Sequence, residues 1–235
     1  MGLYDRNYAQ PEHSEEALYE YAHRDETSRA IFIKQTYQLF AASLLAASAG
    51  AYLGIGMANV IKTWFWGLVI LEFGFLIGLH FAKRKAGLNL ILLFGFTFVS
   101  GLTLTPLLFQ ILHMPSGANI VANAFILTTV AFGGLSVFAM NTKKDFSSMG
   151  KILFIGLIIL IVASLIGIFF HSPIFQLVIS SVSALLFSAY VLYDTQNIIR
   201  GAYETPIEGA IALYLDFLNI FVSLLRILGI LSSDD

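Results

Sequence analysis

The stretch LYLDFLNIFVSLLRILGIL, residues 213–231, is apolar and long enough to cross a membrane as a single helix. A spanning helix needs about 20 mainly apolar residues, because each residue advances about 1.5 Å through a hydrocarbon layer about 30 Å thick. The stretch nevertheless contains Asp216 and Arg226. A charged side chain inside a spanning helix is costly to bury, so it usually faces the interior of a bundle and has a partner there. The remainder of the chain must therefore supply other spanning helices and a partner for Asp216.

Six further stretches of this kind precede it. Of the 235 residues, 57% are apolar and only 12% are charged, about half the charged fraction of a soluble domain. We predict an all-α integral membrane protein, a seven-transmembrane-helix bundle with spans at residues 32–53, 64–82, 88–111, 119–140, 150–170, 174–199 and 209–231. Residues 1–30 are expected to form a hydrophilic acidic tail and residues 31–235 the transmembrane domain. The chain has no cysteine, which excludes disulfide bonds and thiolate chemistry.

Lysine and arginine are concentrated on one side of the predicted bundle. Eleven lie in the N-terminal tail, at the entry of the first helix or in the loops on that side, against two, Lys62 and Arg226, on the other. Because cytoplasmic loops carry the excess of basic residues, the N-terminus is predicted to be cytoplasmic and the C-terminus outside. A last segment that enters the membrane and returns would instead leave both ends cytoplasmic. The compact, cysteine-free chain favours a bacterial inner (plasma) membrane.

The partner of Asp216 is expected on the preceding helix. Asp194 lies six residues before Arg200, about 9 Å from the end of the sixth span, and Asp216 lies about 10 Å into the seventh. The short connection makes these two helices antiparallel neighbours. The two carboxylates are therefore predicted to lie at the same depth on adjacent helices.

Helical spacing extends this pairing into two polar stripes. At 100° per residue, one side of the sixth span carries Ser180, Ser183, Tyr190, Asp194 and Asn197, and one side of the seventh carries Asp216, Asn219 and Ser223. Serines alone are explained by hydrogen bonds between helices. Such hydrogen bonding does not require an ionisable group, so the two aspartates indicate a function.

Two carboxylates in a site of low dielectric cannot both ionise cheaply, so they share a proton. This chemistry suits a proton-gated latch, a proton relay or a site for a divalent cation. Carboxylate and amide oxygens favour Ca²⁺ over zinc or copper.

The second predicted span adds further candidates. Glu72 lies near mid-membrane, and Lys83 follows eleven residues later on the same face. A carboxylate at that depth is a functional candidate by default. The basic run Lys83, Arg84 and Lys85 is explained more simply as a cytoplasmic anchor.

Four segments carry a resemblance to a known family: LYLDFLNIFVSLLRILGILSS, AYVLYDTQNI, FGFTFVSGLTLTPL and LEFGFLIGLHFAKRK. From about residue 30 to its end the chain resembles the Bax inhibitor-one family, the YccA-like proteins with a transmembrane Bax-inhibitor motif. The resemblance implies a seven-helix bundle with a central last helix. It also implies a pH-sensitive passive Ca²⁺ leak controlled by a di-aspartyl pair, at the motif positions Asp194 and Asp216.

The resemblance also assigns expectations to the second span. The family's glutamate is matched by Glu72. A bacterial relative has an arginine that latches the aspartate pair at the position of Lys83. A lysine cannot make the bidentate fork of an arginine, so Arg84 is the second candidate for the latch.

We expect the shared proton and this latch to close the cytoplasmic end at low pH, and deprotonation to open it at higher pH. The side chains expected to line the path of ions or protons are Glu72, Asn197, Asn219 and Ser223. Ca²⁺ is expected as a permeant or transiently bound ion at Asp194 and Asp216, with no cofactor.

Other classes of function are less consistent with the sequence. Intramembrane aspartyl proteases have Gly-x-Gly-Asp before the second aspartate, whereas this chain has LYLD, and the seventh span has no lysine for a retinal Schiff base. No phosphate-binding loop, dinucleotide fingerprint or catalytic triad is present, so we expect neither an enzyme nor a nucleic-acid partner. A proton-coupled cation transporter would use the same carboxylates. A protein that interacts with a membrane-protein partner, regulating quality control or a stress response, is the remaining alternative, with the acidic tail as its docking segment.

Overall fold

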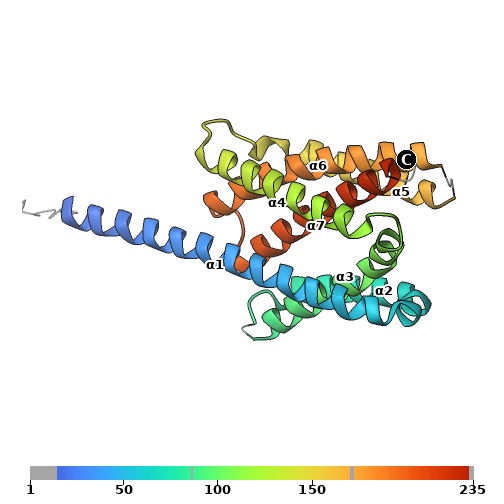
Figure 1. The fold of residues 1–235 in the computed structure, drawn as a ribbon. Coiled ribbons are helices and arrows are strands. Elements are labelled where there is room, and N and C mark those ends of the chain that lie inside the picture. The colour runs from blue at the N-terminus through green and yellow to red at the C-terminus, as the bar shows by residue number, and fades with distance from the viewer. Residues whose placement is uncertain (1–14, 86, 170–171, 233–235) are drawn as a thin grey trace, which may run out of the picture.

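The computed structural model describes residues 15–85, 87–169 and 172–232 and is all-helical over them (Figure 1). Its helices are α1 (Glu15–Gly56), α2 (Ala58–Ala82), α3 (Leu88–Leu112), α4 (Gly117–Asn141), a 3₁₀ turn η1 (Ser147–Met149), α5 (Gly150–Phe169), α6 (Pro173–Arg200) and α7 (Pro206–Leu231). In the described part of the chain, seven helices are long and apolar enough to cross a membrane. The predicted fold class and number of spans are confirmed.

The first helix is much longer than its predicted span. Hydropathy predicts a span at residues 32–53, but α1 begins at Glu15, and its N-terminal part extends beyond the other helices (Figure 1). Hydropathy locates the apolar part of a helix, and the helix-forming polar residues before it simply continue the turns. The proposed boundary between tail and transmembrane domain at residue 30 therefore falls inside a continuous helix, and residues 1–14 of the tail lie outside the described residues.

The bundle presents an apolar surface. Leu45, Ile70 and Leu185 are 70% to 74% exposed, in a pattern that continues over most helices. A soluble monomer rarely exposes a large contiguous apolar surface, so these side chains face lipid. Trp64 and Trp66 are also exposed, near one end of α2, where tryptophan is favoured at a membrane–water interface. The chain is a multi-pass membrane protein.

Two groups of helices are joined mainly by the last one, with smaller direct contacts of α3 with α4 and of α1 with α6. α3 contacts α1 and α2, whereas α6 contacts α4 and α5. α7 contacts α1 and α3 in the first group and α4 and α6 in the second, and a larger share of it is buried than of any other span in the described chain. The central position of this helix stays a prediction.

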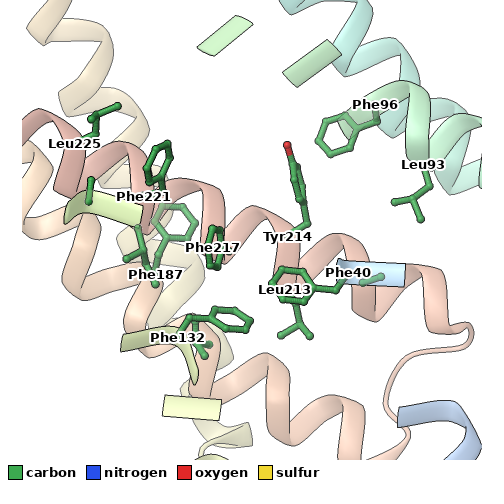
Figure 2. Packing of buried hydrophobic residues seen from close by; sticks show 14 of the residues in the cluster. Phe40, Leu93, Phe96, Phe132, Phe187, Leu213, Tyr214, Phe217, Phe221 and Leu225 are labelled. Atoms are coloured by element: carbon green, nitrogen blue, oxygen red, sulfur yellow. The ribbon is translucent and has the colours of Figure 1, made fainter. Parts of the chain in front are cut away.

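Aromatic side chains form the join between α7 and its neighbours (Figure 2). The ring of Phe217 lies 5.9 Å from that of Phe40 on α1 and 5.6 Å from that of Phe132 on α4. Phe40 and Phe132 stack on each other at 4.9 Å. On another side of α7, the ring of Tyr214 meets the edge of Phe96 from α3 at 5.8 Å. Asp216 and Ser223 lie on the side of α7 that faces α6.

Candidate functional site

The connection between α6 and α7 positions the site. Gly201 adopts a left-handed conformation (φ 70°), which glycine takes without steric cost, and ends α6. Thr205 begins α7 with a capping box: its side chain accepts from the Glu208 N–H, and Glu208 accepts from the Thr205 N–H. Pro206 suits the first turn, where no N–H is needed. We call this end of the bundle the inner end and the opposite end the outer end.

Asp194 and Asp216 are brought together near the inner end. Asp194 is 6% exposed and Asp216 is 2% exposed. Their side chains lie within hydrogen-bonding reach of each other. The structure thus places the two carboxyl groups side by side on neighbouring helices, in the arrangement derived from their depth.

Asp194 has hydrogen-bond donors. The Tyr203 hydroxyl donates to Asp194 Oδ1 at 2.7 Å, and the Asn197 side chain also bonds Asp194. Burial, and then the neighbouring Asp194 carboxyl, raise the pKa of Tyr203 far above its ordinary value of 10. Tyr203 therefore keeps its proton and remains a donor at every physiological pH.

Sequence reasoning missed Tyr203. It lies in the connection rather than on a helical stripe, nine residues after Asp194, so helical periodicity could not identify it. The available signal was a tyrosine in a short connection directly beside the predicted pair.

Asp216 has no such donor. Its Oδ2 is buried and receives no hydrogen bond from any donor group among the described residues. A hydrogen bond between Asp216 and the neighbouring Asp194 carboxyl can form only when one of the two groups carries a proton and donates it to the other. A buried carboxylate without a donor is costly, so this geometry favours a proton held between the two groups.

The basic residues considered for a latch contact the α6–α7 connection instead of the aspartates. Lys83 Nζ lies 3.1 Å from Glu208 Oε1 and 3.2 Å from Glu204 Oε1. Arg84 donates to Glu204 Oε2 from Nη2 at 2.7 Å and from Nε at 3.2 Å. These four residues, Lys83, Arg84, Glu204 and Glu208, form what we call the ionic clasp. A latch built from them would act on the pair through Glu204, which directly follows Tyr203.

The clasp stays charged over a wide range of pH. Its hydrogen bonds to Glu208, and then to Glu204, raise the pKa of Lys83. Hydrogen bonds from Arg84, and then from Lys83, lower the pKa of Glu204 below its ordinary value of 4.5. Near neutral pH neither group changes its charge, so the clasp ties α2 to the α6–α7 connection without sensing protons.

A second loop is held against α6 close to the pair. The Gln196 amide donates to the Lys144 carbonyl and accepts from the Phe146 N–H, both at 2.7 Å. Arg200 pairs with Asp145 at 2.6 Å. Hydrogen bonds from Ser147, and then from Arg200, lower the pKa of Asp145 to about 2. The α4–α5 connection is thus fastened to the inner end of α6.

Glu72 belongs to a separate polar cluster. The Thr103 hydroxyl donates to its carboxylate at 2.5 Å. Nearby, Ser100 on α3 is hydrogen-bonded to the Tyr214 hydroxyl on α7. Glu72 is half-buried between α2 and α3, and among the described residues no hydrogen bond or ion pair joins it to Asp194 or Asp216.

Farther along α7, one further residue of each stripe meets the other. Ser223 is hydrogen-bonded to Ser183 of α6 at 2.8 Å. The Asn219 amide donates to the Leu215 carbonyl at 2.8 Å, and Ser223 donates to the Asn219 carbonyl at 2.6 Å. Their polar atoms are satisfied locally, so these residues offer a weakly polar lining rather than a binding site.

A cavity of about 890 Å³ occupies the outer half of the bundle. Asn219 and Ser223 line it, together with Thr103, the partner of Glu72. The two aspartates do not line it, and one turn of α7 separates Asp216 from Asn219. The cavity therefore ends short of the buried pair.

In the described part of the chain, no group of three or more acidic, histidine or cysteine side chains could hold a metal ion. Ca²⁺ takes about six to eight oxygen ligands when it is stored in a protein. Two carboxylates and one amide can contact a passing cation, but they do not make a storage site.

The chain is similar to known proteins over most of its length. Residues 29–233 match the family described as inhibitor of apoptosis-promoting Bax1. An uncharacterized protein of Campylobacter jejuni is 61% identical over 232 residues, 97% of each chain. An uncharacterized membrane protein of Vibrio cholerae is 40% identical over 208 residues, 86% of this chain and 91% of that protein. The Golgi anti-apoptotic protein of vaccinia virus is 33% identical over 211 residues, 86% of each chain.

Proposed function

The chain belongs to the family of inhibitors of apoptosis-promoting Bax1, and on that premise we propose that it is a pH-sensitive passive Ca²⁺ leak channel gated by Asp194 and Asp216. The observation that carries the proposal is the pair itself: two buried carboxyl groups within reach of each other on neighbouring membrane helices. Ionisable side chains at such positions commonly serve ion or proton movement.

The gate works through the charge of the pair. With one proton shared, the two carboxyl groups attract each other and hold the inner ends of α6 and α7 together. When that proton leaves, two negative charges in a site of low dielectric repel each other. We expect this repulsion to separate the helices at higher pH and to leave an anionic passage that a divalent cation can enter.

The route would begin in the outer cavity and end at the pair. Asn219 and Ser223 line the cavity, and Glu72 is bonded to the cavity residue Thr103. The aspartates lie one turn of α7 further in. A cavity that stops short of the pair supports a passage closed at its inner end.

The proposal includes an orientation in the membrane. The basic residues of the inner end place it in the cytoplasm by the positive-inside rule, with the N-terminus on the same side and the C-terminus outside. The membrane is proposed to be the bacterial inner membrane. Ca²⁺ and protons then move along the gradients across that membrane.

Flux measurement tests the gate. Purified protein in liposomes should pass Ca²⁺ at a rate that rises between about pH 5 and pH 8. The double variant Asp194→Asn/Asp216→Asn cannot change its charge in this way, so its flux should be independent of pH. Asp145→Asn is the matched control, because this exposed carboxylate lies at the same end but outside the pair, and it should keep the wild-type profile.

Two other results would redirect the proposal. Flux that saturates and exchanges against protons would indicate a proton-coupled cation transporter with the same aspartates. No flux above empty liposomes at any pH would reject the channel. The interaction alternative would then be favoured, because the vaccinia virus relative is described as a Golgi anti-apoptotic protein. That function would involve binding to a membrane-protein partner.

A further inference from the structure

The outer cavity has an opening that the proposed ion path does not require. It is lined by residues of α3, α5, α6 and α7, by Phe65 of α2 and by Met114 of the α3–α4 connection. α3 and α5 do not contact each other in the described chain, so the cavity lies in the gap between them. On α5, Ile161 and Leu165 line it and are 47% and 55% exposed. An opening between two membrane helices leads sideways into lipid.

The depth of the cavity matches one leaflet. Along α7 its lining extends from Asn219 to Ile230, eleven residues or about 16 Å of helix. Half of a hydrocarbon core about 30 Å thick is about 15 Å. We call the part of the cavity between α3 and α5 the slot. Its length matches the depth that one acyl chain occupies in a bilayer.

A positive charge stands at the outer part of this slot. Arg226 lines the cavity five residues before the end of α7, about 8 Å from that end. In the described part of the chain no carboxylate or other hydrogen-bond partner contacts its guanidinium, and the residue is exposed on the side of the cavity. Gln110 and Gln176 line the same outer part. An unpaired guanidinium on a spanning helix, short of the helix end and beside apolar walls, favours an anionic partner.

The deeper walls suit a hydrocarbon chain. Leu160, Phe187 and Val222 line the cavity below the level of Arg226. Among the polar side chains there, Ser183 and Ser223 are bonded to each other, Asn219 to the Leu215 carbonyl and Thr103 to Glu72. Their hydrogen bonds are already made, so an apolar chain can lie against them without leaving a polar group unsatisfied.

From this combination we infer that the cavity binds one phospholipid with an anionic headgroup, its phosphate on Arg226 and one acyl chain in the slot between α3 and α5. The guanidinium fork matches the geometry of phosphate oxygens. The Arg226 side chain could instead extend to the membrane–water interface, where water would solvate its charge. That alternative would not explain why a lateral opening as deep as one leaflet lies beside it. The inference concerns binding alone and does not rest on the proposed channel, whose path along Asn219 and Ser223 a bound acyl chain would occupy.

Native mass spectrometry of the full-length protein in detergent tests the inference, with dioleoyl-phosphatidylglycerol and dioleoyl-phosphatidylcholine offered together. The wild type should retain one phosphatidylglycerol in clear preference to phosphatidylcholine. Arg226→Gln should reduce that preference by about tenfold, the effect expected for loss of one charge-assisted hydrogen bond. Lys62→Gln is the matched control: it removes an exposed cation of the outer end that does not line the cavity, and it should keep the preference.

A second variant tests the slot without changing any charge. Ser164 of α5 lines the cavity, and Ser164→Trp should fill it and weaken retention of both lipids. This variant decides the matter if gel filtration shows that Arg226→Gln does not fold. The inference is overturned if Arg226→Gln keeps the preference, if Lys62→Gln loses it equally, or if Ser164→Trp retains both lipids. It is also overturned if oleate, a carboxylate amphiphile, depends on Arg226 while phosphatidylglycerol does not.

Discussion

The two aspartates differ in their surroundings. Asp194 accepts from Tyr203 and bonds Asn197, whereas Asp216 Oδ2 has no donor within the described residues. A hydrogen bond to an ionised carboxylate stabilises its charge. Asp194 is therefore the better place for the negative charge of the pair, and Asp216 is the better place for the proton.

Tyr203→Phe should move the flux transition to higher pH. The substitution removes the 2.7 Å hydrogen bond to Asp194, which stabilises the ionised form more than the protonated one. A bond of this kind contributes about 1.5–3 kcal/mol, so the pair should then release its proton less readily. Ca²⁺ flux into liposomes as a function of pH measures the shift.

The control for this variant is Tyr52→Phe. Tyr52 is 79% exposed on α1, so loss of its hydroxyl should leave the transition unchanged. A Tyr203→Phe profile that coincides with the wild type, or that moves to lower pH, would contradict the assignment of Tyr203 as a donor to the ionised pair.

The ionic clasp joins elements that are far apart in sequence. It links the end of α2 to the connection before α7, next to Tyr203. Because the pKa of Glu204 is lowered, its contribution to stability is complete above the ordinary value of 4.5 and is lost only as the pH falls through the lowered value. The raised pKa of Lys83 keeps the lysine charged up to alkaline pH. The clasp therefore persists across the range in which we expect the aspartates to respond.

A charge exchange tests the clasp. Arg84→Glu and Glu204→Arg should each lower the melting temperature in detergent, because each places like charges together. The double variant should recover most of the loss, since it restores the pair in reverse. For Arg84→Glu the loss should persist from about pH 8 to pH 5, shrink when Glu204 protonates at lower pH, and diminish at high salt.

Lys85→Glu serves as the matched control, because this exposed neighbour of Arg84 takes no part in the clasp. It should melt like the wild type. A double variant no more stable than the single variants would show that Arg84 and Glu204 are not coupled.

Close backbone contact joins α1 and α3. A Cβ on Gly101 would collide with the backbone carbonyl of Ala47, and one on Gly50 with that of Phe98. Small residues at such crossings allow membrane helices to approach each other closely. Backbone atoms cannot move aside as a flexible side chain can, so the two helices must separate if either glycine gains a side chain.

Gly101→Ala should consequently destabilise the protein by about 1–3 kcal/mol, as overpacking does in tightly packed interiors. Thermal unfolding in detergent measures the effect. The control is Gly133→Ala on α4, where the added Cβ meets no atom within 4 Å. This variant should not lower the stability of the protein. Equal stability of the two variants would rule out the close crossing of α1 and α3.

For the whole molecule, the orientation in the membrane can be read from single cysteines, because the natural chain contains none. Lys144→Cys lies in the α4–α5 connection at the inner end and Ser116→Cys in the α3–α4 connection at the outer end. In intact bacterial cells, a membrane-impermeant maleimide should label Ser116→Cys and spare Lys144→Cys. The reverse pattern would overturn the positive-inside assignment, and disruption of the cells should make both sites reactive.

Much of the architecture follows from local sequence. Seven apolar stretches of spanning length, separated by short polar connections, led to seven helices because no backbone group can remain unpaired in hydrocarbon. The depth of Asp194 and Asp216 could be calculated because a helix advances by a constant rise per residue. The stripe that joins Ser183 to Ser223 was equally accessible, since it depends on helical periodicity alone.

Interactions across the bundle depend on how the elements come together. Lys83 pairs with Glu204 and Glu208, and Tyr203 donates to Asp194. α3 and α5 line one cavity without contacting each other. Helical periodicity relates none of these segments. The length of α1 beyond its apolar part was also missed, because hydropathy measures transfer into lipid and not the persistence of a helix. The sequence alone thus determined the class, the number of spans and the two buried carboxylates, through rules that act within one helix. Tertiary packing alone decided which donors, cations and cavities surround those carboxylates, because such contacts depend on the relative rotation and separation of helices.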